Sequence, residues 1–146
     1  MNGKYKIFII IGVVVTIGLI FVLGMMLNKK QANIENIKIT IGNSTIYSNN
    51  EIELAIDIVL EKLKKFPAVI NEIVYDEEKS KVDSHAAARQ YNTDDIIVLY
   101  SNFTTYPNVE FMFQASPLNA NSDYKDWKWI LVRNTNGEWE VKSHGY

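Results

Sequence analysis

The stretch SNNEIELAIDIVLEKLKKFP, residues 48–67, decides how the rest of the chain must fold. Ser48 and Glu51 have the spacing of a capping box, in which each side chain bonds the backbone of the other residue. Apolar side chains then recur every three or four positions, so the predicted helix has one apolar face. They are Ile52, Ala55, Ile56, Val59, Leu60, Leu63 and Phe66. Acids come early and lysines late, which suits the helix dipole, and Pro67 ends the helix. This face needs a sheet to cover it.

The residues that follow the helix supply the strands of that sheet. β-Branched and aromatic runs predict strands at 69–75, 96–103 and 109–115, with a turn at 106–108. Residues 127–133 and 138–142 predict a hairpin that turns at 134–137. An acidic exit is expected at 76–80, a short alanine-rich helix at 83–91, and a loop at 116–123. Strands linked by hairpins after a leading helix predict an α+β domain, in which a curved antiparallel sheet packs on one long helix.

Upstream of the helix, residues 7–27 form an apolar run of 21 residues whose only hydroxyl group belongs to Thr16. A helix of this length spans about 30 Å, the thickness of the hydrocarbon core of a bilayer. Residues 27–31 offer no small-x-small cleavage site, although a cleaved signal peptide is the competing interpretation. We therefore expect a cytoplasmic tail at 1–6, a transmembrane anchor at 7–27, a stalk with a short strand at 28–47, and an extracytoplasmic domain at 48–146.

Four runs between residues 48 and 146 carry a resemblance to a known family. They are SNNEI from Ser48, NEIVYDEEKS from Asn71, ARQYNTDDIIVLYSNF from Ala88, and DWKWILVR from Asp126, before the final GY. The chain resembles a family of small membrane-anchored extracytoplasmic domains of unknown function from low-GC Gram-positive bacteria. The resemblance implies a cystatin-like fold, similar to nuclear transport factors, with one long helix cradled by a curved sheet. It implies no catalytic residues.

Composition and charge exclude several classes of protein. The 146 residues, of 16.8 kDa, allow one domain with an appendage, and there is no cysteine for a disulfide, a thiolate metal site or a lipid anchor. From residue 31 onward 11 basic residues face 17 acidic ones, a net charge of −6. A domain this acidic is poorly suited to nucleic acid, so no nucleic-acid partner is expected.

Catalytic and metal-binding patterns are weak. The acids at 76–78 could seed a calcium site, but they lack EF-hand spacing and are explained more simply as a solvated strand exit. His85 and His144 belong to no metal-binding spacing, and neither a nucleophile elbow nor a glycine-rich phosphate loop occurs. We expect no cofactor and no metal, and the protein is not expected to be an enzyme.

The last hairpin supplies the candidate partner-binding residues. If the turn has two or four residues, odd positions of the first strand share a face with even positions of the second. Ile130, Val132, Trp139 and Val141 then form an apolar face against the long helix. The opposite face mixes aromatic and charged side chains, as binding surfaces do. Its candidate residues are Trp127, Trp129, Arg133, Glu140, Lys142 and His144, and Leu131 lies on the same face. Alternatively, Trp127 and Trp129 are covered by the loop at 116–123 or by Tyr146 and form a second core.

These patterns predict a non-catalytic recognition domain, tethered by a single span to the cell membrane with its C-terminal domain outside. Its partner would be a peptide or an envelope protein. One alternative is a structural subunit of an envelope complex that assembles through the anchor helix. Another is a small hydrolase that uses the pocket of the cone.

Overall fold

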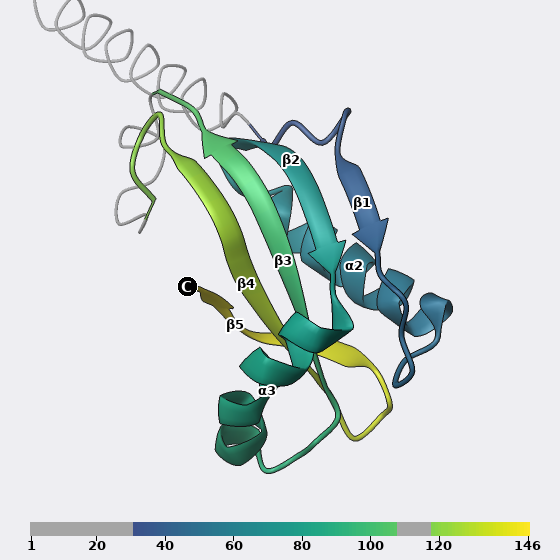
Figure 1. Cartoon of the computed structure of the whole chain (residues 1–146). Coiled ribbons are helices and arrows are strands. Elements are labelled where there is room, and N and C mark those ends of the chain that lie inside the picture. Colours follow the sequence, from purple (N-terminus) through teal and green to yellow (C-terminus); the bar gives the residue numbers. More distant parts are fainter. Residues whose placement is uncertain (1–30, 108–117) are drawn as a thin grey trace, which may run out of the picture. The chain divides into compact units, whose positions relative to one another are not determined.

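A computed structural model describes residues 31–107 and 118–146, all within the unit Gln31–Tyr146. Among these residues the order of elements is β1 (Lys38–Ile41), α2 (Asn49–Leu63), β2 (Ala68–Tyr75), α3 (Glu77–Tyr91), β3 (Ile96–Thr105), β4 (Asp123–Arg133) and β5 (Trp139–Gly145). The strands form one sheet in the order β1-β2-β3-β4-β5. Strand β1 pairs with β2 in parallel, and the other neighbours pair in antiparallel fashion. In Figure 1, α2 lies behind this twisted sheet and α3 lies in front of it.

The predicted fold class is therefore corrected. The domain is α+β, but its sheet is mixed, and its described residues include two helices of equal length, each of 15 residues. The sheet is mixed because β1, α2 and β2 form a crossover unit, in which the helix returns the chain to the end of the sheet where β1 began. Within residues 31–107 and 118–146, no helix is long and apolar enough to cross a membrane. The predicted span at 7–27 and the predicted strand at 109–115 lie outside the described residues.

Helix α2 confirms the interpretation of residues 48–67. The Glu51 N–H donates to Ser48 Oγ at 3.4 Å, and the Ser48 N–H donates to Glu51 Oε2 at 2.9 Å, which completes the capping box. The predicted apolar face is the buried one. Its buried members are Ile52, Ala55, Ile56, Val59 and Leu63. Leu60 and Phe66 are partly buried against the same cluster. The helix ends at Leu63, three residues earlier than the periodicity suggested.

Helix α3 begins where an acidic strand exit was expected, and that expectation is wrong. Asp76 is the N-cap residue, and its Oδ1 accepts the Lys79 N–H at 3.0 Å. Glu77 and Glu78 occupy the first turn, where carboxylates are favoured by the helix dipole. The helix ends at Tyr91 and is capped by Asn92, whose φ of 53° is left-handed, as is common after a helix. The acids mark the start of a helix.

The β4–β5 turn sets which side chains of the hairpin share a face. The Asn134 N–H donates to the Glu138 carbonyl at 2.8 Å, so three residues lie between this pair, and Gly137 has a φ of 83°. A three-residue loop of this kind ends in a left-handed residue. Arg133 therefore pairs with Trp139, odd with odd. A bulge opposite Ile130 and Leu131 then shifts the register, so that Trp129 pairs with His144.

The predicted composition of the two hairpin faces is therefore wrong near the turn. Leu131 and Trp139 belong to the core cluster that packs on α2, together with Trp127 and Trp129. Val132 belongs to a second, smaller cluster on the other face of the sheet, where Ala87 of α3 covers it. The prediction that Trp129 shares a face with His144 is confirmed, because the bulge restores the expected parity.

Candidate functional site

The structure buries the tryptophans among the candidate partner-binding residues. Trp129 is 0% exposed and Trp127 is 6% exposed. The Trp129 indole N–H donates to Ser101 Oγ at 2.9 Å, which satisfies its polar atom inside the core. Trp127 meets Tyr146 edge-to-face, with ring centroids 5.4 Å apart. These contacts favour the alternative interpretation of the two tryptophans as core, and they join the main core instead of forming a second one.

Arg133 ties the hairpin to α2. Its guanidinium donates to Glu51 Oε1 at 2.6 Å and lies 2.8 Å from Asp95 Oδ2. It also stacks over the Trp139 ring, 4.3 Å from the centroid. The bonds from Ser48 and Arg133 lower the pKa of the Glu51 carboxyl to about 2. Arg133 is thus fully engaged in holding the hairpin on the helix.

His144 covers the aromatic end of the core. Its ring centroid lies 4.9 Å from that of Trp129 and 5.9 Å from those of Trp127 and Phe66. Partial burial against these rings lowers the pKa of the imidazole, and the charge of Lys62 acts in the same direction. The neutral imidazole is therefore the favoured form at this position.

Glu140 and Lys142 lie apart from the aromatic candidates. Both are exposed on β5, and Lys142 Nζ lies 2.8 Å from Glu140 Oε2. Glu140 is the register partner of Val132, on the face opposite Trp129. The six candidates therefore divide into two buried tryptophans, the half-buried Arg133, the exposed His144 beside the tryptophan rings, and an exposed charged pair on the edge strand.

Glu77 is a carboxylate whose role the sequence did not reveal. It is 8% exposed, and its oxygens accept the Ser44 hydroxyl at 2.8 Å, the Thr45 N–H at 2.5 Å and the Thr45 hydroxyl at 2.8 Å. The Ile46 N–H and Lys81 Nζ donate to it as well. These donors, Lys81 first, hold the pKa of Glu77 far below its usual range. The carboxylate pins the loop before α2 to the first turn of α3.

The described residues contain no group of three or more histidine, cysteine, aspartate or glutamate side chains that could hold a metal ion. Of the acids at 76–78, which were considered as the seed of a calcium site, Asp76 caps α3 and Glu77 fastens the loop at 44–46.

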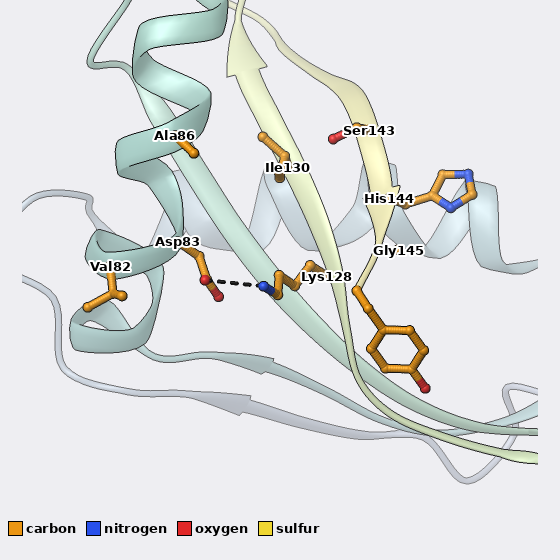
Figure 2. Close-up of a pocket in the computed structure, with 9 residues that line it drawn as sticks. Val82, Asp83, Ala86, Lys128, Ile130, Ser143, His144 and Gly145 are labelled. Carbon is orange, nitrogen blue, oxygen red and sulfur yellow. Dashed lines mark hydrogen bonds and ion pairs between the residues drawn. The ribbon is translucent and has the colours of Figure 1, made fainter.

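A pocket opens on the outer face of the sheet, between α3 and the end of β5. We call it the α3–β5 groove, and its cavity volume is about 280 Å³. It is lined by Val82, Asp83 and Ala86 of α3, by Lys128 and Ile130 of β4, and by Ser143, His144, Gly145 and Tyr146. Figure 2 shows Asp83 and Ala86 facing Lys128 and Ile130 across the groove, while the His144 ring points away from them.

Two features give the groove its chemistry. Val82 is 71% exposed on one side and Tyr146 is 75% exposed on the other, so both rims are apolar. At the floor, Asp83 accepts the Tyr100 hydroxyl at 2.8 Å and lies 3.2 Å from Lys128 Nζ. Its carboxylate therefore fixes the lysine in place. Burial, followed by the bond and charge of Asp83, raises the pKa of Tyr100 well above its usual range.

A signal for the groove was present in the sequence. Val82 is the one large apolar residue in EEKSKVDSHAAA, residues 77–88, and a lone exposed valine on a polar helix lacks a partner in the core. The predicted helix began at Asp83, whereas α3 begins at Glu77. The prediction therefore left Val82 outside the helix, and its unusual exposure on a polar helix was not recognised.

No protein-family model, curated protein or solved structure matches this chain, so the family resemblance stays a prediction from the sequence.

Proposed function

We propose that the domain is a non-catalytic recognition module that binds an extended peptide segment of an envelope protein in the α3–β5 groove. The observation that carries the proposal is the pair of exposed apolar side chains, Val82 and Tyr146, on either side of a floor made by Ile130. Large exposed apolar side chains around a concavity are typical of interaction sites.

The size and chemistry of the groove favour a peptide side chain. About 280 Å³ is enough for one or two side chains but small for a cofactor, since ligand pockets usually enclose about 300–1,000 Å³. An aliphatic side chain would pack on Ile130 and between Val82 and Tyr146. Lys128 Nζ, already fixed by Asp83, lies within the same pocket and can donate to a peptide carbonyl.

Several carboxylates that could act as a general acid or base already have structural partners. Glu51 caps α2 and holds Arg133, Glu77 fastens the loop before α2, and Glu72 accepts from Lys38 Nζ at 2.8 Å. The pKa of each of these three carboxyl groups is lowered, so all three are ionised near neutral pH. Ionised carboxylates of this kind are suited to ion pairing and poorly suited to proton transfer at that pH. These assignments support a binding role.

The membrane tether in this proposal rests on the apolar run at 7–27 and on the lysines that flank it. The anchor would hold the domain at the outer face of the cell membrane, within reach of envelope proteins. Protease added to intact protoplasts should then digest residues 31–146. Complete protection, while a known external marker is cleaved, would contradict the outward orientation.

The groove is tested by selecting binders to the full-length chain, in mild detergent, from a phage library of random heptapeptides. We expect the selected peptides to share an aliphatic residue and to bind Ala86→Arg at least about tenfold more weakly, because the long side chain fills the groove. His85→Arg is the matched control, since the neighbouring exposed residue does not line the groove. A failure to enrich any sequence, or equal binding to Ala86→Arg, would reject the proposal.

A further inference from the structure

We infer that two copies of this chain associate through β5, paired in antiparallel fashion around a two-fold axis that passes beside Val141. Strand β5 is the last strand of the sheet, and among the described residues it pairs only with β4. Its other edge therefore presents backbone groups that a further strand can bond. This inference concerns the strand edge and is independent of the α3–β5 groove.

The backbone of Val141 faces this free edge. The hydrogen bond from the Asn134 N–H to the Glu138 carbonyl marks a hydrogen-bonded pair at the turn. Such pairs alternate with non-bonded pairs along an antiparallel ladder. Glu140, opposite Val132, is then the next bonded residue, and Val141, opposite Leu131, directs its N–H and C=O away from β4. Two copies can exchange both bonds at Val141.

The side chains on either side of Val141 are complementary to those of a second copy related by the same two-fold rotation. In that register, Glu140 of one copy lies opposite Lys142 of the second copy, and Lys142 lies opposite Glu140. Opposite charges in such positions stabilise strand pairing, and like charges oppose it. Within one chain these two side chains form an ion pair at 2.8 Å on one face of the strand, so they are close enough to exchange partners. Val141 is partly buried, and on the opposite face of the strand it would lie beside Val141 of the second copy.

The bulge near Lys142 and Ser143 limits the length of this ladder. It interrupts the regular β5 edge after Val141, and a bulge at an edge shortens the run of residues that can pair. We therefore expect a weak dimer whose population rises with protein concentration.

Because the chain has no cysteine, single cysteines can report this contact directly. Residues in a hydrogen-bonded antiparallel pair have Cα atoms about 5.5 Å apart, within the range that a disulfide spans. Full-length Val141→Cys, oxidised in mild detergent, should form a disulfide-linked dimer. Leu54→Cys is the control, since Leu54 is 51% exposed and belongs to α2 instead of the β5 edge. Equal cross-linking of the two variants would overturn the inference.

Charge reversal provides a second test that does not depend on cysteine. By sedimentation equilibrium, Glu140→Lys and Lys142→Glu should each weaken association by about tenfold, because the two-fold axis repeats every unfavourable pair. The double variant Glu140→Lys/Lys142→Glu should restore association, since the pairs become complementary again. Association that persists in both single variants, through the N-terminal run for example, would also overturn the inference. So would a double variant as weak as the single ones.

Discussion

Trp129 is the side chain on which most of the aromatic end of the core converges. It is fully buried, bonded to Ser101, and in ring contact with Phe66 and His144. Trp139, on the same sheet face, contacts Tyr47 and Arg133 near the edge of the core. Its indole nitrogen has no hydrogen-bond partner within the described part of the chain. The two tryptophans therefore contribute to stability by different amounts.

We expect Trp129→Ala to lower the free energy of unfolding by about 3–5 kcal/mol, because it leaves a large cavity and an unpaired Ser101 hydroxyl. Trp139→Ala should cost less, since its indole N–H gives up no hydrogen bond. Urea denaturation of the two variants measures the difference. Val82→Ala, at a residue 71% exposed, should stay within about 0.5 kcal/mol of the wild type. A larger loss in Trp139→Ala than in Trp129→Ala would contradict this ranking.

Glu77 and Glu78 offer a matched comparison at neighbouring positions. Glu77 accepts the Thr45 and Ile46 N–H groups, whereas the Glu78 side chain is 89% exposed. In Glu77→Gln the amides of Thr45 and Ile46 should exchange with solvent about tenfold faster or more, because the loop loses its charged acceptor. Glu78→Gln should leave those rates unchanged. Unaltered protection of both amides in Glu77→Gln would mean that the loop is held by other contacts.

At the scale of elements, local signals predicted α2 well and the last hairpin poorly. The capping box, the apolar period and Pro67 all lie within residues 48–67, in α2 or directly beside it, so each reports on its own neighbours. The faces of β4 and β5 depend instead on the number of residues in the turn and on a bulge. Neither is visible in the alternation of the strands, and an error of one residue moves a side chain to the other face.

The cap of α2 can be tested by itself. Ser48→Ala should lower the free energy of unfolding by about 1 kcal/mol, because the first turn loses a side-chain acceptor. Ser48→Asp should retain most of the stability, since aspartate is an equally good cap. Thermal unfolding followed by circular dichroism measures both. A loss in Ser48→Asp as large as that in Ser48→Ala would show that Ser48 acts through something other than its side-chain acceptor.

At the scale of the whole molecule, the sequence predicted an α+β domain but missed the parallel edge of the sheet. The isoleucines at 37–41 indicated a strand, yet nothing local shows which neighbour it pairs with. That choice follows from the crossover through α2, which places Lys38 beside Glu72. The groove was missed for a related reason: it lies between α3, which ends at Tyr91, and β5, which begins only at Trp139, so no local pattern joins them.

Two kinds of ionisable group should shape the pH dependence of stability. Neutral His144 is favoured in the fold, so the unfolded chain binds more protons as the pH falls through the ordinary histidine value of 6.5. Stability should therefore decrease on acidification from about pH 7 to the lowered pKa of His144. The carboxylates with a lowered pKa, Glu51, Glu72 and Glu77, add stability above about pH 4.5 that is lost as the pH falls further.

Melting temperatures measured between pH 3 and pH 8 should therefore fall in two stages. His144→Asn should remove the first stage and keep the second, while His85→Asn, at an exposed position on α3, should keep both. An unchanged first stage in His144→Asn would contradict the assignment to His144.

The three-residue turn between β4 and β5 also matters when this chain is compared with relatives. Arg133 and Trp139 share a face only because an odd number of residues separates Asn134 from Glu138. A relative with one residue more or fewer in that turn would need its buried tryptophan shifted by one position along β5. An alignment scored by residue identity would then place a gap inside β5 and pair interior positions with exterior ones. Such sequences are better aligned by matching their interior positions than by matching residue identities.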